Sequence, residues 1–168
     1  PAVALAWKMN EESFLKDATS VSTLKLRAGW GVTGQQDIGV SYPSIPLYLV
    51  SNIQAQYQFG NSFYNTYRPQ PYNSNLKWEE TTTVNAGLDY GFAKGRVYGS
   101  IDAYFKKTKD LLSTINIPVG TNFNNLLTTN VGNMEVKGIE GSINIAAIKT
   151  ENINWDFGFN IAYNNRKV

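Results

Sequence analysis

The chain has 168 residues, the length of one ordinary domain, a formal charge of +2, and 17% charged residues, below the quarter typical of soluble domains. It contains no cysteine and no histidine, which excludes thiol catalysis, disulfides, zinc fingers and a Ser-His-Asp triad within this sequence. Its basic residues are dispersed apart from the lysines in 106–109, so we expect no nucleic-acid partner. No run of 18 apolar residues predicts a transmembrane helix. Aromatic residues make up 13%, which favours a strand-rich, all-β fold.

Five segments alternate apolar with polar or small residues, the pattern of a strand with one apolar face. Their apolar-face positions are Leu24, Leu26, Ala28, Trp30 and Val32; Val84, Ala86, Leu88, Tyr90 and Phe92; Val97, Gly99, Ile101, Ala103 and Phe105; Ile139, Gly141, Ile143, Ile145 and Ala147; and Trp155, Phe157, Phe159, Ile161 and Tyr163. Each set covers nine residues, which at about 3.3 Å per residue and a tilt of about 40° climb about 23 Å, close to the apolar band of an outer-membrane barrel. With one further segment at the start, the pattern predicts about six antiparallel, up-and-down strands, near residues 2–7, 22–33, 76–92, 96–108, 136–148 and 154–166.

The connections between these strands alternate in length. Residues 92–96 and 148–154 form short turns, and a short helix is expected near 11–17 because Asn10 is a good N-cap before two acids. Long excursions are expected near 34–75 and 109–135. In outer-membrane barrels the short turns are periplasmic and the long loops extracellular, so the helix is expected on the periplasmic side.

The first short turn predicts a register. A four-residue turn places Tyr90 opposite Val97 and Leu88 opposite Gly99, and brings Asp89 diagonal to Arg96 within reach of a salt bridge.

Alternation alone also fits a soluble β-sandwich acting as a surface binding or adhesion module. The charges favour a membrane barrel, because the apolar-face positions within the five bands carry none. Charges of the same parity appear only beyond the bands, at Glu80, Lys107, Lys109, Glu135 and Lys137. A Lys or Arg facing lipid near the midplane costs about 2–4 kcal/mol, which would select this distribution.

Several blocks of the sequence resemble the SusC/RagA family of TonB-dependent receptors of Bacteroidota. They are residues 24–35 (LKLRAGWGVTGQ), 75–79 (NLKWE), 85–90 (NAGLDY), 102–112 (DAYFKKTKDLL), 130–133 (NVGN) and 137–140 (KGIE). Their order and spacing match the barrel region of that family over about residues 20–168.

The resemblance implies a location in the cell outer membrane and a 22-stranded barrel, to which this chain contributes one part. It also implies contact with membrane lipid, a plug and a TonB box that couples to TonB, and a SusD-like surface lipoprotein that captures glycan or peptide cargo. No plug or TonB-box segment occurs in this sequence, and Pro1 is no translation start, so we expect the chain to be a piece of a longer receptor. An open six-stranded sheet would also leave two unpaired edges, which lipid does not tolerate.

Two motifs that suggest chemistry have simpler explanations. Residues 29–34 match G-x-G-x-x-G, but loop-like residues follow rather than the helix that a dinucleotide site needs, so no cofactor is expected. Glu79 and Glu80 are adjacent in a predicted strand and point to opposite faces, so they cannot flank one glycosidic bond. We expect no metal site and no enzymatic activity in this chain.

Two sets of residues are candidates for function. The first is a lumenal polar wall made by the charged residues Lys25, Arg27, Asp89, Arg96, Asp102, Glu140 and Asp156. The second is an aromatic set in the first long excursion, expected to contact cargo or a lid protein: Tyr42, Tyr48, Tyr57, Tyr64 and Tyr67. Packing of that loop against its neighbours would also account for these aromatic residues, and the sequence leaves both explanations open.

Overall fold

The computed structural model describes residues 1–35, 39, 41–118, 120 and 125–168. The chain forms two compact units. The sheet unit comprises Pro1–Thr33, Glu80–Lys109 and Asn133–Val168, and the loop unit comprises Gly34–Glu79 and Asp110–Gly132. No helix among the described residues is long and apolar enough to cross a membrane.

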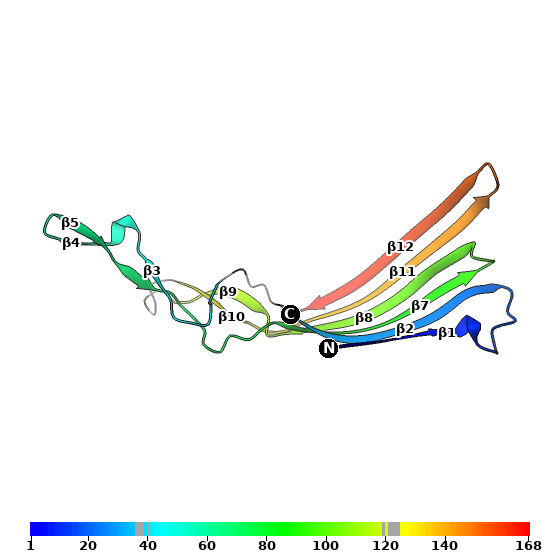
Figure 1. Ribbon diagram of the computed structural model, residues 1–168, viewed down its shortest axis with the longest axis horizontal. Coiled ribbons are helices and arrows are strands. Elements are labelled where there is room, and N and C mark those ends of the chain that lie inside the picture. Colours follow the sequence, from blue (N-terminus) through cyan, green and yellow to red (C-terminus); the bar gives the residue numbers. More distant parts are fainter. Residues whose placement is uncertain (36–38, 40, 119, 121–124) are drawn as a thin grey trace. The chain divides into compact units, whose positions relative to one another are not determined.

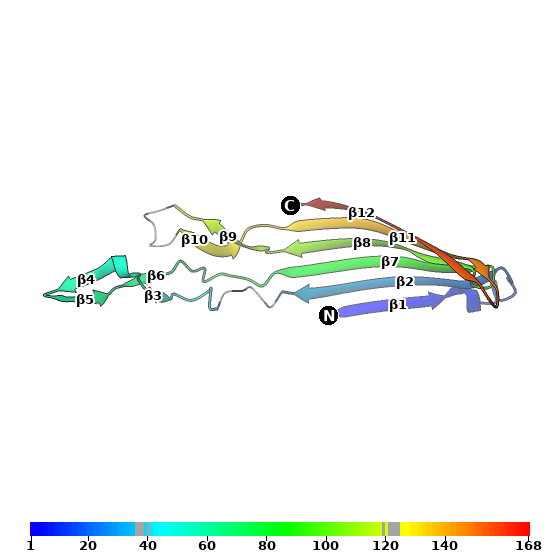
Figure 2. The ribbon, with the colours of Figure 1, turned by 90° about the horizontal axis from the view of Figure 1, so that it is seen from above.

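The sheet unit is built on six long strands in sequence order (Figures 1 and 2). They are β1 (Ala2–Lys8), β2 (Val21–Gly34), β7 (Glu80–Phe92), β8 (Val97–Lys109), β11 (Met134–Lys149) and β12 (Asn154–Lys167). The pairs β1–β2, β7–β8, β8–β11 and β11–β12 are antiparallel, and β2 lies beside β7. The predicted all-β fold with an up-and-down sheet of six strands is therefore confirmed.

The loop unit contains short hairpins where the sequence analysis expected long loops. Strand β3 (Tyr48–Val50) pairs with β6 (Tyr67–Pro69), and β4 (Gln56–Phe59) pairs with β5 (Ser62–Asn65). The second excursion holds β9 (Leu112–Asn116) paired with β10 (Leu126–Asn130). A 3-10 turn, η2 (Ile53–Ala55), precedes β4.

The strand expected from residue 76 begins only at Glu80. Side chains take the backbone groups before it: the Asn73 Oδ1 atom accepts from the Asn75 N–H, and the Asn130 Oδ1 atom accepts from the Lys77 N–H. Asparagine offers the backbone such an alternative to a ladder, which a pattern of apolar residues does not reveal.

The helix predicted near 11–17 is wrong. A single 3-10 turn, η1 (Met9–Glu11), is followed by turns. Asn10 does not cap a helix, because its Oδ1 atom accepts the Leu24 N–H on the next strand. The Trp7 indole donates to Glu12 at 2.8 Å and the Lys8 ammonium lies 3.1 Å from Glu11, so both acids serve side chains rather than a helix N-terminus.

The predicted register of the β7–β8 hairpin is wrong by two residues. Phe92 lies opposite Val97, and Tyr90 lies opposite Gly99 instead of Val97. The turn comprises residues 93–96, with φ of 52° at Ala93 and 80° at Gly95, so Phe92 belongs to the strand rather than to the turn. Since the shift is even, every side chain keeps its predicted face. The predicted Asp89–Arg96 contact is lost, because Asp89 lies opposite Ser100.

The sheet has no hydrophobic core. None of the described apolar side chains is buried, and Val84 and Ile101 are 47% and 51% exposed. The accessible surface is 12,673 Å², whereas a folded monomer of this mass exposes about 8,300 Å². A soluble β-sandwich would require a second sheet over the apolar face, and the described residues supply none.

Two glycines on the apolar face, Gly99 and Gly141, differ in the space around them. A Cβ at Gly99 would overlap the Ser142 carbonyl oxygen and lie 2.8 Å from the Tyr90 hydroxyl, which itself donates to that carbonyl at 2.9 Å. A Cβ at Gly141 would meet its nearest atom, on Ile161, at 3.5 Å. In the full receptor, Gly99→Ala should therefore lower the free energy of unfolding by about 1–3 kcal/mol, as overpacking does. Gly141→Ala is the matched control and should change it little. Denaturant unfolding measures both, and equal effects of the two substitutions would contradict the packing described.

Candidate functional site: the two faces of the sheet

The register divides the sheet into an apolar face and a polar face. On β7, β8, β11 and β12 the apolar face forms cross-strand rungs, each with one residue per strand. Three successive rungs are Thr82, Lys107, Glu135 and Lys167; Val84, Phe105, Lys137 and Asn165; and Ala86, Ala103, Ile139 and Tyr163. Apolar residues therefore give way to charged ones within two rungs, near the end where the chain enters the loop unit.

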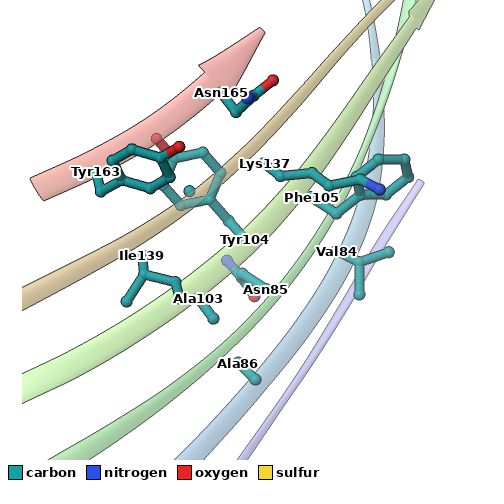
Figure 3. Close-up of a pocket in the computed structure, with 11 residues that line it drawn as sticks. Val84, Asn85, Ala86, Ala103, Tyr104, Phe105, Lys137, Ile139, Tyr163 and Asn165 are labelled. Carbon is teal, nitrogen blue, oxygen red and sulfur yellow. The ribbon is translucent and has the colours of Figure 1, made fainter. Parts of the chain in front are cut away.

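The apolar face is hollowed at this boundary (Figure 3). A groove of about 540 Å³ lies over the directly opposed Ala86 and Ala103, whose methyl groups leave space between larger neighbours. Its other apolar-face lining residues are Val84, Phe105, Lys137, Ile139, Tyr163 and Asn165. The lining also includes Asn85, Tyr104 and Gly138 from the other parity, and the only charged residue in it is Lys137.

Ion pairing orders part of the rim. The Lys107 ammonium lies 3.1 Å from the Glu135 carboxylate on the neighbouring strand. The Lys137 Nζ atom lies 5.2 Å from the centroid of the Phe105 ring, at cation–π distance. Among the described residues, no carboxylate lies within ion-pairing distance of Lys137.

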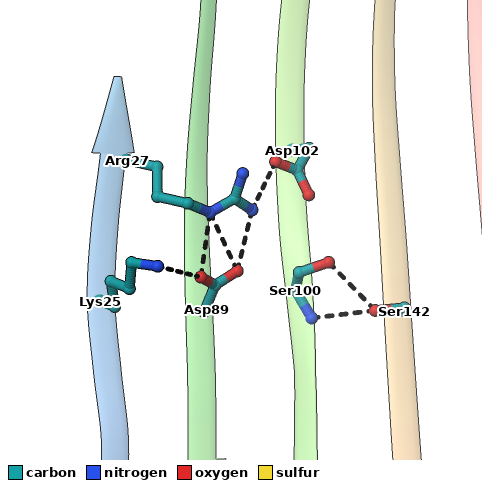
Figure 4. Close-up of polar contacts among 6 residues, drawn as sticks. All are labelled: Lys25, Arg27, Asp89, Ser100, Asp102 and Ser142. Atoms are coloured by element: carbon teal, nitrogen blue, oxygen red, sulfur yellow. Dashed lines mark hydrogen bonds and ion pairs between the residues drawn. The ribbon is translucent and has the colours of Figure 1, made fainter. Parts of the chain in front are cut away.

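The polar face carries a charge network over three strands (Figure 4). The Arg27 guanidinium on β2 donates to both carboxylate oxygens of Asp89 on β7, at 2.8–3.1 Å, and to Asp102 on β8 at 2.8 Å. The Lys25 ammonium lies 3.8 Å from Asp89. These side chains are about one third exposed, so water screens the pairs, and the two-pronged arginine geometry is the strongest element of the network.

A glycine makes this network possible. Gly87 lies on β7 directly opposite Asp102, and a Cβ there would overlap the Asp102 carboxylate and lie 2.7 Å from the Arg27 Nη2 atom. The missing side chain lets Arg27 cross β7 from β2 to β8. The sequence predicted the charged residues but not the role of Gly87. The one indication of that role in the sequence is that Gly87 occupies a polar-face position between Asn85 and Asp89.

A hydroxyl and carboxylate trough continues the polar face towards β12. It has a volume of about 270 Å³, and its polar-face lining includes Ser100, Asp102, Glu140, Ser142 and Asn160. The Ser100 and Ser142 hydroxyls lie 3.1 Å apart across β8 and β11. Asp102 and Glu140 are directly opposed, which concentrates negative charge in the trough. Three or more acidic, histidine or cysteine side chains able to hold a metal do not gather anywhere in the described residues.

The structure brings together four of the seven predicted wall residues: Lys25, Arg27, Asp89 and Asp102. Glu140 lies across from Asp102 but outside the arginine network. Arg96 closes the turn after Phe92, and Asp156 lies opposite Ala146, next to a bulge before Ile148 that interrupts the β11–β12 ladder. These two residues are placed on the sheet but not in the cluster.

The predicted aromatic residues lie in the loop unit and are exposed. Tyr57 and Tyr64 are directly opposed in the β4–β5 hairpin, which turns at Gly60 with φ of 63°. The five tyrosines expose 56–70% of their surface: Tyr42, Tyr48, Tyr57, Tyr64 and Tyr67. Packing within the loop unit therefore leaves most of each ring free.

The motifs that suggested chemistry have structural roles, and of the two adjacent glutamates only Glu80 lies in a strand, because β7 begins there. Residues 29–34 (GWGVTG) lie entirely within β2, so the glycines form part of a strand instead of a phosphate-binding turn. The Glu79 carboxylate accepts from the Leu112 N–H at 3.4 Å, while Glu80 lies opposite Lys109.

Known proteins are similar to this chain over its whole length. It is 54% identical over 168 residues to the TonB-dependent receptor SusC of Bacteroides thetaiotaomicron, and 39% identical to the TonB-dependent receptor P39 of Formosa agariphila. All of this chain aligns, but it spans only 17% and 15% of the length of those receptors.

Solved structures share the fold. A structure of the RagAB peptide transporter superposes with a TM-score of 0.83 at 23% identity, covering 98% of this chain and 17% of that chain. The RagAB peptide importer in its open-open state superposes with a TM-score of 0.79 at 24% identity. A family model described as TonB dependent receptor-like, beta-barrel matches residues 1–167. The chain belongs to the β-barrel family of TonB-dependent receptors, which are outer-membrane proteins, and it forms a six-stranded segment of such a barrel.

Proposed function

We propose that the chain is the wall segment of an active importer of bulky nutrients, either oligosaccharides or peptides, that works with a SusD-like surface lipoprotein and TonB. The observation that carries the proposal is a single sheet that is bare on both faces, apolar on one and joined by an arginine–carboxylate network on the other. A wall between lipid and a water-filled lumen needs this pair of faces. The segment itself carries no chemistry in this proposal.

The proposed orientation follows from the connections. The turn at residues 93–96 and the turn between Lys149 and Asn154 lie at one end of the sheet, with η1 and its following turns. These would be periplasmic, and the loop unit would be extracellular. The apolar face would then meet lipid, and the Arg27 network would face the lumen.

The proposed contacts for cargo or lid are the exposed tyrosines of the loop unit. Aromatic rings supply large contact area and stack on sugar rings or peptide groups, and tyrosine adds a hydrogen-bonding hydroxyl. The peptide alternative is supported by one solved neighbour, which is described as a peptide transporter. Within this set, Tyr57 and Tyr64 are directly opposed in the β4–β5 hairpin, so their rings lie on the same face of it.

The lipid-facing assignment is tested by placing an arginine on each face of β8 at the same depth. Ile101 lies in the middle of the apolar band, and Ser100 is its neighbour on the polar face. Ile101→Arg should lower the free energy of unfolding of the full receptor in lipid vesicles by about 2–4 kcal/mol, whereas Ser100→Arg should cost less than about 1 kcal/mol. Unfolding in vesicles by urea measures the difference. Equal tolerance at the two positions would contradict a membrane wall.

The lumenal network is tested by its arginine and its glycine. Arg27→Gln leaves Asp89 and Asp102 without their shared cation, and Gly87→Ala forces Arg27 away from Asp102. Each should lower the free energy of unfolding of the receptor by about 1–2 kcal/mol, more than an isolated exposed pair provides. Lys106→Gln, which removes a polar-face cation that stacks on Tyr104, is the control and should cost less. If Gly87→Ala is neutral, Arg27 does not cross β7 at this point.

The loop tyrosines are tested together. Replacing Tyr57, Tyr64 and Tyr67 by Ala should weaken cargo uptake or recovery of the lipoprotein partner, because hot-spot truncations cost about 2 kcal/mol or more. The barrel yield should not change. Ile53→Ala in the same unit, where Ile53 is 79% exposed, is the control for loss of exposed apolar surface. Wild-type uptake together with wild-type complex recovery would assign these rings to loop packing alone.

A further inference from the structure

The proposed transport function makes no use of the groove on the apolar face. We infer that the groove binds a phosphorylated lipid of the outer leaflet, the lipid A portion of lipopolysaccharide. One acyl chain lies over Ala86 and Ala103, and a headgroup phosphate lies against the Lys137 ammonium. The inference rests on the orientation given under the proposed function, which places this end of the sheet in the outer leaflet.

The lining of the groove suits hydrocarbon. Its floor is two alanine methyl groups, and its walls include Val84, Phe105 and Ile139. Water here would find few hydrogen-bonding partners, because the surface of the groove is almost entirely apolar. A neighbouring lipid supplies a chain at no cost in exposed polar groups.

The charged rim fixes where the headgroup lies. The groove occupies the rungs of Ala86 and Val84, and the next rung outward begins the fully polar surface. A chain held over Ala103 therefore has its headgroup beside Lys137, which lies one rung away on β11. A lysine can extend its stem along apolar surface and keep its ammonium at such a boundary.

The charge balance of the rim selects an anionic headgroup. Its apolar-parity charges are four lysines and two glutamates: Lys107, Lys109, Lys137, Lys167, Glu80 and Glu135. Glu135 is already paired with Lys107, whereas the Phe105 ring holds the Lys137 ammonium at the groove without neutralising it. Such a rim attracts phosphate. It also repels a second copy of itself, which disfavours the same face as a contact between two receptors.

The side of the groove formed by β12 completes a polar boundary. Tyr163 and Asn165 line it opposite Phe105 and Ala103 (Figure 3). Tyr163 is 69% exposed and lies opposite Ile139, on the last apolar rung. A tyrosine at that level places its ring in hydrocarbon and its hydroxyl among headgroups, where it can donate to phosphate or sugar oxygens.

The test uses the full receptor purified in mild detergent from outer membranes, with retained lipid measured by native mass spectrometry. Two variants address the two parts of the site: Lys137→Gln removes the cation, and Ala103→Phe fills the groove. Each should lower retained lipid A about fivefold, the change expected for one lysine at a membrane surface. Lys106→Gln, one residue from Phe105 but on the polar face, is the charge-matched control and should retain the wild-type amount.

Adding lipid back separates phosphate recognition from simple filling. Delipidated wild-type receptor should bind lipid A about fivefold more tightly than enzymatically dephosphorylated lipid A. The Lys137→Gln receptor should bind the two equally. Equal retention in wild type and Lys137→Gln, or equal binding of both lipids by wild type, overturns the inference. So does a retained mass that corresponds to a glycerophospholipid or to the acyl chains of a lipoprotein.

A separate labelling experiment tests the proposed orientation of the receptor in the membrane. Asn61→Cys places a thiol in the turn of the β4–β5 hairpin, for labelling on intact cells by a membrane-impermeant maleimide, with the parent receptor as background. Labelling with no selective lipid retention overturns the inference and leaves the proposed orientation standing. An unlabelled thiol on a folded receptor overturns both. If Ala103→Phe fails to fold, judged by heat-dependent migration on gels, Lys137→Gln and the add-back measurement decide.

Discussion

A sheet one layer thick must have all of its backbone hydrogen bonds made between its own strands. In the part of the chain that the structure describes, the inner strands are joined by antiparallel ladders, the outer edges of β1 and β12 have no strand partner, and the solvent on each face then decides which side chains it carries. Hydrocarbon offers no partner for an unpaired N–H or C=O, so a membrane wall of strands is workable only when the ladder is complete. The absence of a core follows directly, because a wall has a solvent on each side and nothing to enclose.

The same constraint explains why the two faces of the sheet are stabilised by different interactions. On the apolar face, we propose that stabilisation comes from contact with lipid, and the small residues Ala86 and Ala103 leave a hollow that a lipid chain can fill. On the polar face, charges are held together by geometry across strands: Arg27 reaches Asp102 only because Gly87 leaves its path open. Gly87 thus acts by leaving space for side chains from the neighbouring strands, and not by adopting a turn conformation.

The loop unit differs from the sheet unit in its strand pairing and in the exposure of its aromatic residues. Its three short strand pairs have only three, four and five paired residues, and its tyrosines keep most of their surface free. Exposed aromatic surface on loops carried by a rigid sheet is typical of recognition, because the scaffold carries the folding free energy and the loops are left to vary. This division accounts for a chain in which the alternating strand pattern and the proposed contact residues occupy separate segments.

The sequence by itself determined the faces, the number of long strands and the ends at which the turns are short. Those properties depend on a period of two and on the cost of placing charge in lipid, both of which are local to each strand. Register was not local: the parity around Phe92 was correct, but the exact partner depended on which residues adopt positive φ in the turn, and Ala93 and Lys94 give no such signal. Tertiary contacts also overrode the local helix signal at Asn10, since the Leu24 backbone competes for the same side-chain oxygen. The Arg27 network and the groove over Ala103 exist only across strands that are distant in sequence, so neither could be predicted before the order and register of β2, β7, β8, β11 and β12 were known.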